Sequence, residues 1–421
     1  MIFIANALPM NGGTTFLIRM CRDLNVRGKR PRVLVMFNQV DIALLKELEK
    51  WADVSCLSTF SKPMFRRFFN NQAGSFLPLD LRRLDALLEE HDREVHVMGL
   101  FGLLFVARML KRGLSAIKLT VGIYHQNEFM FAGVDYYFSN EARRLFSVLD
   151  SQSLIFFNEA SRDSHSKFFG VNYVNSTLVP VGVTLPMNVS GGVGDAKSGR
   201  IVSIGNLHNF KTYNWHVIKC MREFLKINPK IVYEIYGDGP CRKELEDLAV
   251  SLGVQDSVLF KGCIDYSDMD KVLNGAFVFV GSGTAIIEAS ALGIPSVIGI
   301  ESSVEPVTYG FLSDAAGYTY HEMVPGRETL SICDVVISIM RDENAWESSS
   351  AACILKARDF SITNTVNGFI RAFCHCSYFD CSSVLGYSNL ISLLSLSVCA
   401  VKNALRIDNA FANRRNQGSI S

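Results

Sequence analysis

The fold is decided by residues 280–297, which read VGSGTAIIEASALGIPSV. An apolar run ends at Val280, small residues turn the chain, and an apolar helix begins near Thr284. A second apolar run follows at residues 296–299, after a Gly and a Pro that end the helix. A strand, a helix and a strand in this order predict a parallel sheet covered by helices.

The same alternation extends over most of the chain in two blocks. The first block has strand candidates at residues 2–6, 32–37, 95–98, 119–124, 154–158 and 176–179, and the second at 200–204, 231–236, 257–260, 277–280 and 296–299. Between the blocks, the composition becomes too polar and glycine-rich to pack. We therefore predict an α/β protein with two Rossmann-like, doubly wound parallel-sheet domains. A ligand is expected in the cleft where the carboxyl ends of both sheets face each other.

The predicted boundaries divide the chain into five parts. An N-terminal Rossmann-like domain covers residues 1–187, a linker covers 188–199, and a C-terminal Rossmann-like domain covers 200–373. A helical segment follows at 374–407, and the polar tail at 408–421 is expected to fray.

The composition is that of a folded globular chain. Of 421 residues, 48% are hydrophobic and 20% are charged, which leaves little room for general disorder. The 42 basic and 41 acidic residues give a net charge of +1, so we expect no nucleic-acid partner. The 11 cysteines are an odd number without regular spacing, which favours a reducing cytoplasm over a secreted disulfide framework.

Spacing argues against three other kinds of segment. The longest apolar stretches, residues 97–110 and 390–401, are shorter than the roughly 18 to 20 residues that cross a bilayer. Residues 1–8 lack the basic region of a signal peptide, so we interpret them as a strand. The cysteines and the histidine of residues 374–381 lack the second matched pair of a zinc site.

The turn after Val280 has the chemistry of a phosphate site. Backbone N–H groups converge there at the positive end of a helix, which suits an anion. Glu288 lies on the first or second turn of that helix, where its carboxylate can accept hydrogen bonds from ribose hydroxyls. The alternative interpretation is an ordinary strand-to-helix turn with a solvated Glu.

This segment resembles the nucleotide-sugar signature of retaining glycosyltransferases of the GT-B fold, family 4, in the form found in bacterial surface-polysaccharide enzymes. In that family a Glu commonly precedes the small-residue turn, and a second Glu follows eight positions later. Glu288 matches the second Glu, whereas Val280 stands in the place of the first. The resemblance implies that the nucleotide sugar is bound by Gly281, Ser282, Gly283, Thr284 and Glu288.

A second loop, within residues 201–214, is close to a Walker A sequence. Gly205 is followed by four residues and then by Phe210 and Lys211, and the second Gly of a P-loop is missing, so an NTPase is not expected. The loop resembles the family's strand and loop that bring an Arg and a Lys to the donor diphosphate. Lys211 matches the Lys, and Asn206 stands where the Arg usually lies. The alternative for Lys211 is a solvated lysine at a helix start.

The resemblance also implies roles for three weaker elements. The turn at residues 234–240 resembles the family's approach to the base pocket, and Gly262, at the end of the next strand, is expected to contact the base. Gly12 and Gly13 resemble the glycine-rich first loop, which approaches the donor phosphates because glycine has no Cβ.

Two histidines and a threonine complete the predictions for the first block. Thr14 is the expected N-cap of the first helix. His125, just after a central strand, stands where relatives carry a His that faces the transferred sugar; the alternative is a structural hydrogen-bonding role. His96, on an earlier strand, is expected to be structural.

The resemblance implies a retaining hexosyltransferase, with residues 1–187 as the acceptor-side domain and residues 200–373 as the nucleotide-sugar-binding domain. It would move a sugar from a nucleoside-diphosphate donor, UDP-linked in our expectation, to a hydroxyl of a lipid-linked or growing bacterial surface glycan. The expected catalytic residues are His125, Lys211 and Glu288, with no metal and no cofactor. Two alternatives stay open: a nucleotide-sugar 2-epimerase of the same fold, and a non-catalytic subunit that binds a nucleotide sugar.

A basic and aromatic stretch at residues 60–83 predicts a surface for membrane contact. Its aromatic and basic residues are Phe60, Lys62, Phe65, Arg66, Arg67, Phe68, Phe69, Arg82 and Arg83. Such a patch suits an anionic membrane face, with the rings inserted and the cations at the headgroups. We therefore expect a cytoplasmic protein, peripheral on the inner face of the membrane. The alternative is that these aromatics belong to the core.

Overall fold

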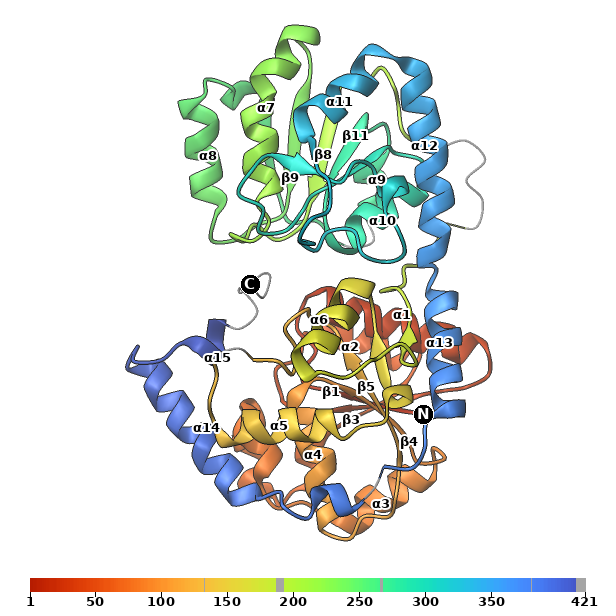
Figure 1. Ribbon diagram of the computed structural model, residues 1–421, viewed down its shortest axis with the longest axis vertical. Helices are drawn as coiled ribbons and strands as arrows, with labels where there is room; N and C mark the ends of the chain where they lie inside the picture. The colour runs from red at the N-terminus through yellow and green to blue at the C-terminus, as the bar shows by residue number, and fades with distance from the viewer. Residues whose placement is uncertain (132, 187–192, 266–267, 380, 414–421) are drawn as a thin grey trace. The chain divides into compact units, whose positions relative to one another are not determined.

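The computed structural model describes residues 1–131, 133–186, 193–265, 268–379 and 381–413 (Figure 1). The chain forms two compact units. Unit 1 consists of residues 1–179 and 362–421, and unit 2 consists of residues 180–361.

Unit 1 is built on a parallel sheet with the strand order β3-β2-β1-β4-β5-β6-β7. The strands are β1 (Ile2–Ala5), β2 (Arg32–Val35), β3 (Asp53–Cys56), β4 (Glu94–Met98), β5 (Lys118–Ile123), β6 (Leu154–Phe156) and β7 (Thr177–Leu178). The helices are α1 (Gly12–Val26), α2 (Ile42–Glu49), α3 (Leu81–Glu89), α4 (Leu100–Lys111), α5 (Tyr137–Ser147), α6 (Glu159–Phe169), α13 (Ile362–His375), α14 (Asn389–Ala404) and α15 (Ala410–Asn413).

Unit 2 repeats this plan with the strand order β10-β9-β8-β11-β12, again parallel. The strands are β8 (Arg200–Ile204), β9 (Val232–Tyr236), β10 (Val258–Gly262), β11 (Val278–Gly281) and β12 (Ser296–Ile298). The helices are α7 (Tyr213–Ile227), α8 (Arg242–Ser251), α9 (Met269–Leu273), α10 (Gly283–Ala291), α11 (Ile332–Arg341) and α12 (Glu343–Ala357), and β13 (Val307–Thr308) pairs with β14 (Leu330–Ser331).

The two sheets confirm the predicted pair of doubly wound α/β domains. In each sheet the strand order reverses next to the first strand, between β1 and β4 and between β8 and β11. In open α/β sheets, ligands bind outside the carboxyl ends of the strands at such a switch point. In unit 2, a ligand is therefore expected at the loops that follow β8 and β11.

The domain boundaries differ from the predicted ones. Unit 2 begins at Pro180 and not at residue 200, and residues 362–373 belong to unit 1. Of the predicted linker 188–199, residues 188–192 lie outside the described residues, while residues 193–199 are already part of unit 2. There the Val193 N–H donates to the Leu292 carbonyl over 2.8 Å.

Helix α13 shows why the chain returns to unit 1. It packs beside α1 (Figure 1), and the Phe369 ring lies 4.7 Å from the ring of His96 on β4. At Gly368, an added Cβ would lie 2.1 Å from Cγ1 of Val179, so the helix approaches β7 more closely than any side chain allows. The apolar face of α13 therefore covers the sheet of unit 1.

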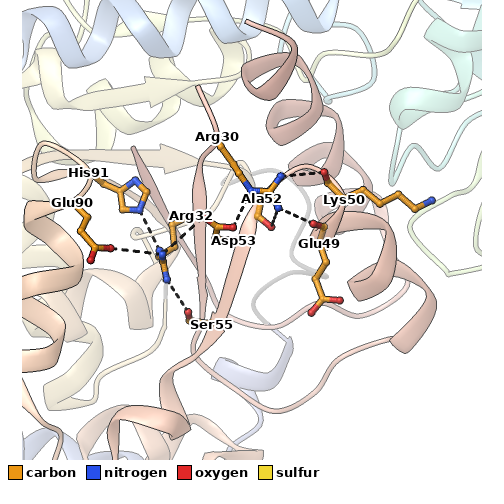
Figure 2. A network of polar contacts seen from close by, with 9 residues as sticks. All are labelled: Arg30, Arg32, Glu49, Lys50, Ala52, Asp53, Ser55, Glu90 and His91. Atoms are coloured by element: carbon orange, nitrogen blue, oxygen red, sulfur yellow. Dashed lines mark hydrogen bonds and ion pairs between the residues drawn. The ribbon is translucent and has the colours of Figure 1, made fainter. Parts of the chain in front are cut away.

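Two arginines, Arg30 and Arg32, make hydrogen bonds at the amino ends of strands β2 and β3 (Figure 2). Arg30 donates to Asp53 Oδ1 over 2.9 Å and to the carbonyls of Glu49, Lys50 and Ala52, the last turn of α2 and the residues after it. The last carbonyls of a helix lack intrahelical donors, so a guanidinium there satisfies them. Arg32 extends the network to Ser55 and His91. This cluster is structural, because it lies at the amino end of the strands.

Candidate functional site

The loop between β11 and α10 carries the first part of the site. Ser282, the N-cap of α10, has an extended backbone with φ −133°, and Gly283 follows with φ +66°, a left-handed conformation that side chains disfavour. The Ser282 hydroxyl makes no cap. It donates instead to Glu301 Oε1 over 2.6 Å. The first N–H groups of a helix have no intrahelical partner, so the start of α10 presents donors.

The loop between β8 and α7 brings Lys211 to this place. Lys211 Nζ lies 2.7 Å from the position that a Cβ on Gly205 would occupy, so the absence of that Cβ makes room for the ammonium group. Burial disfavours the charge, but the Tyr213 hydroxyl and the Glu301 carboxylate outweigh it and raise the pKa of Lys211. Lys211 therefore stays protonated at neutral pH.

A second contact fixes the lysine loop against the segment after β12. The backbone N–H of Ser302 donates to the carbonyl of Phe210 over 2.6 Å, next to both Lys211 and Glu301. The loop also meets the turn after β9, because a Cβ on Gly237 would lie 2.0 Å from the Gly205 carbonyl oxygen. The position of the ammonium group is thus set by backbone packing on two sides.

Tyr320 contacts the start of α10 and lies near the carboxylates of Glu288, Glu301 and Glu322. Its hydroxyl donates to the Gly283 carbonyl over 2.9 Å. Burial raises the pKa of Tyr320 well above its ordinary value, and the charges of Glu322, Glu301 and Glu288 add to the effect. Glu288 and Glu301 are therefore both within electrostatic reach of a hydroxyl at the start of α10. The structure thus brings Lys211, Gly283 and Glu288 to one region of unit 2.

Sequence reasoning missed Glu301 and Tyr320. The signal for Glu301 was present, because this carboxylate comes three residues after the carboxyl end of β12, the edge strand that pairs with β11. No local pattern marks Tyr320, whose position depends on a long loop. Thr284 lies on the first turn of α10 as expected, and Gly281 is the last residue of β11.

The predicted base-contact region lies at the end of β10, which is separated from β8 by β9. Gly262 ends β10 with φ +76°, and its carbonyl accepts from the Gly237 N–H over 2.8 Å. Lys261 lies 3.6 Å from Glu234, which is itself paired with Arg200 at 2.7 Å. Asn206, in the place of the family's Arg, is exposed. The roles predicted for Gly262 and Asn206 stay predictions.

In unit 1, Gly12 and Gly13 form the first turn of α1. The helix is capped by Asn11, whose Oδ1 accepts from the Thr14 N–H over 3.0 Å, so the prediction of Thr14 as N-cap is wrong by three residues. The side-chain amide oxygen of Asn11 reaches the third helical N–H, as in an ordinary cap. No atom lies within 4 Å of a Cβ added to Gly12, and Asn11 Oδ1 is the contact at Gly13, at 3.4 Å. Packing in the structure therefore does not explain these two glycines.

His125 and His96 differ sharply in environment. His125 is exposed and lies two residues beyond β5, where its carbonyl accepts from the Glu128 N–H over 3.0 Å. His96 is fully buried, with Nδ1 3.0 Å from Thr120 Oγ1 and Nε2 2.8 Å from the Tyr124 hydroxyl. Burial lowers the pKa of His96 to about 3. His96 is structural, as predicted, and the role of His125 stays a prediction.

The aromatic stretch at residues 60–83 divides between core and surface. Phe60 and Phe69 are buried in the core of unit 1, so these two rings cannot form an apolar outer face. Phe68 is 43% exposed and Met64 68% exposed, beside basic side chains of the 3-10 helix η2 (Pro63–Asn70). The prediction of a membrane-facing surface is therefore wrong for Phe60 and Phe69. Their spacing in the sequence is compatible with the core as well as with the surface, so spacing did not decide between the two.

The described residues contain neither a metal-binding cluster nor a membrane-spanning helix. No group of three or more His, Cys, Asp or Glu side chains is placed there to hold a metal ion. In the same part of the chain, no helix combines the length and the apolarity that crossing a membrane demands.

Comparisons of the sequence with known proteins point to sugar transfer. Residues 194–307 match the family described as glycosyl transferases group 1, and this range contains the loops of Lys211, Glu288 and Glu301. A curated relative from Haemophilus influenzae, described as an uncharacterized glycosyltransferase, is 26% identical over 298 residues, which is 66% of this chain and 81% of the relative.

Comparisons of the structure show the same fold in solved proteins. Anabaena Alr3699/HepE, solved in complex with UDP and glucose, is similar with a TM-score of 0.59 at 15% identity, over 88% of this chain and 97% of that one. The lipopolysaccharide outer core galactosyltransferase WaaB, in its apo form, has a TM-score of 0.56 at 14% identity, over 88% and 98% of the two chains. Together with the sequence matches, these likenesses support a GT-B glycosyltransferase.

Proposed function

We propose that this protein is a retaining glycosyltransferase of family 4 that uses a UDP-linked sugar. The acceptor would be a hydroxyl of a lipid-linked or growing bacterial surface glycan. The observation that carries the proposal is the charged Lys211, which packs against Gly205 and is linked through the Glu301 carboxylate to Ser282 at the start of α10. This is a site for a leaving diphosphate, and it lies within the matched range 194–307.

The chemistry asks for charge stabilisation at that place. When the bond between the anomeric carbon and the phosphate oxygen breaks, negative charge grows on the diphosphate. Lys211 and the N–H groups of α10 are arranged to stabilise that charge before it forms. Glu288 would accept hydrogen bonds from the ribose hydroxyls. Removing one such electrostatic contact typically costs about 2–4 kcal/mol, or about 10²–10³ in rate.

Binding of UDP to the purified protein tests the proposal. Titration calorimetry should show UDP binding by the wild type, and Lys211→Met should weaken it at least tenfold because the charge is lost at nearly constant side-chain volume. The matched control is Lys219→Met, which removes an exposed lysine from α7 of the same unit. Equal UDP affinity in Lys211→Met and Lys219→Met would reject the site.

Turnover separates the proposal from its alternatives. UDP-sugars incubated without acceptor should be hydrolysed slowly, with the anomeric configuration of the released sugar retained in proton NMR spectra recorded early. Inversion at the second carbon of the sugar would instead identify an epimerase. Binding of UDP-sugars without release of UDP, with or without glycolipid acceptors, would identify a non-catalytic subunit.

A further inference from the structure

Helix α14 of unit 1 has one buried face and one exposed apolar face. Ser392, Leu396 and Cys399 are buried against the unit. The exposed residues are Leu390 (65%), Ile391 (48%), Leu394 (57%), Val398 (51%), Val401 (56%) and, just after the helix, Leu405 (65%). At about 100° per residue, these six side chains fall in a stripe about 100° wide, roughly opposite the buried three. We call this set the α14 stripe.

Such a stripe is unusual on a surface that only water touches. Single exposed apolar side chains are normal, but a contiguous row of Leu, Ile and Val marks a surface that another phase or molecule covers. Helix α14 lies at the edge of unit 1 (Figure 1) and contacts α5 and the 3-10 helix η3 (Gln72–Phe76) on its buried side. Among the described residues, α14 packs through its other face, and about half or more of each side chain in the stripe is exposed.

The charges around the stripe are basic. From residue 381 to residue 407 the sequence contains no Asp or Glu, and its charged side chains are Lys402 and Arg406, both exposed. Asp408, the first acid after this segment, accepts a 2.5 Å hydrogen bond from the Tyr136 hydroxyl. On α5, Glu141 is paired with Arg144 at 2.9 Å. Asp408 and Glu141 thus each have a partner side chain.

The neighbouring segment adds to the same character. Asn389 at the start of α14 donates to the Phe76 carbonyl of η3 over 2.9 Å, which joins α14 to the segment containing η2. In η2, Met64 and Phe68 are exposed, and the exposed cations there and just before are Lys62, Arg66 and Arg67.

We propose that unit 1 docks on an anionic membrane surface through the α14 stripe. The helix would lie in the plane of the interface, with its Leu, Ile and Val side chains at the boundary of headgroups and acyl chains. Lys402 and Arg406 would extend toward the headgroups, as long cationic side chains do. With 16 residues, α14 is about 24 Å long, which suits lying on a bilayer and not crossing it.

The charges of the α14 segment favour an anionic membrane surface over a second copy of the chain as the partner of the α14 stripe. If two stripes packed against each other, Lys402 and Arg406 of each copy would meet a segment without a carboxylate, in either helix direction. An anionic lipid surface supplies the missing negative charge. The inference is independent of sugar transfer, since it concerns a face of unit 1 that contains none of the predicted site residues.

Vesicle flotation tests the proposal with matched variants. The full chain is mixed with vesicles of phosphatidylcholine alone, or of phosphatidylcholine and phosphatidylglycerol at 7:3. Leu394→Glu should reduce partitioning to the acidic vesicles at least tenfold. Leu355→Glu, at a leucine of α12 that is 60% exposed against 57% for Leu394, should leave partitioning unchanged. Lys402→Glu should reduce it at least fivefold, and only for acidic vesicles.

A second pair protects the test against misfolding of one variant. Val401→Asn on α14 and Val250→Asn on α8 change valines that are 56% and 62% exposed, and only the first should weaken flotation. The proposal fails if the wild type floats with neither vesicle, or if each α14 variant floats like its control. It also fails if sedimentation shows a dimer that Leu394→Glu, but not Leu355→Glu, dissociates, because the occupant is then a second copy.

Discussion

Acidification should destabilise unit 1 through His96 in particular. The ring is fully buried between Phe3 and Phe369, with ring centroids at 5.7 and 4.7 Å, and both nitrogens have hydroxyl partners. Thr120 and Tyr124 can complete the hydrogen bonds of a neutral imidazole, but no carboxylate among the described residues is hydrogen-bonded to it. Its charged form is therefore strongly disfavoured by desolvation.

The magnitude follows from the two pKa values. Unfolding restores the ordinary pKa of 6.5, whereas burial lowers the pKa of His96 to about 3. The unfolded state then binds the proton first. The contribution of His96 to stability is complete above pH 6.5 and is lost as the pH falls from 6.5 toward 3. At pH 4 the loss is about 3 kcal/mol, since each tenfold step in the equilibrium is about 1.4 kcal/mol.

Hydrogen exchange of the strands that carry His96 and its partners measures this loss in unit 1 alone. Peptides covering β4 and β5 are compared between pH 7 and pH 4 after correction for intrinsic exchange rates, in the wild type and in His96→Gln. Gln is neutral at both pH values, so its protection should fall only through the other titrating groups. The wild type should lose about 10² more protection than the variant. An equal loss in both proteins would refute the assignment of His96 as a neutral, structural histidine.

Two further predictions concern unit 2. Glu301→Gln keeps an acceptor for the Ser282 hydroxyl but removes the negative charge beside Lys211. Because the repulsion between this charge and the diphosphate is then lost, calorimetry should show UDP binding that is about threefold to tenfold tighter. Unchanged or weaker UDP binding would show that the carboxylate does not face the diphosphate. Gly237→Ala places a Cβ 2.0 Å from the Gly205 carbonyl oxygen. It should lower the free energy of unfolding of unit 2 by about 1–3 kcal/mol in calorimetric melting. A melting temperature equal to that of the wild type would mean that the two loops are not packed as described.

Local patterns were sufficient for most strands of the fold but not for β3 (Asp53–Cys56), an edge strand whose residues are only partly buried. Strands and helices alternate with clear apolar runs and turn residues, and each predicted unit formed its own parallel sheet. The boundaries were harder, because a helix pattern specifies an apolar face but not the sheet that the face covers. Residues 362–375 follow unit 2 in sequence, yet their apolar face packs on unit 1 through Phe369.

The candidate site was predictable where chemistry lies next to a strand end. Lys211 was identified in the short loop after β8, and Glu288 on α10, which begins two residues after β11. Glu301 also follows a strand end, β12, and was missed although this signal was present. Tyr320 was missed because its relation to α10 is made by a hydrogen bond between distant segments, Tyr320 to Gly283. Similarly, Phe60 and Phe69 could not be assigned to core or surface from spacing alone, and they are in the core.

The return of α13 has a consequence for synthesis of the chain. Because residues 180–361 lie between β7 and α13, the ribosome delivers the whole of unit 2 before the helix that covers Phe3, His96 and Phe157. At about 5–20 residues per second, this delay is on the order of ten to forty seconds. Throughout that interval the first sheet to emerge is also the last to be completed, with its aromatic face open to any chaperone that binds nascent chains.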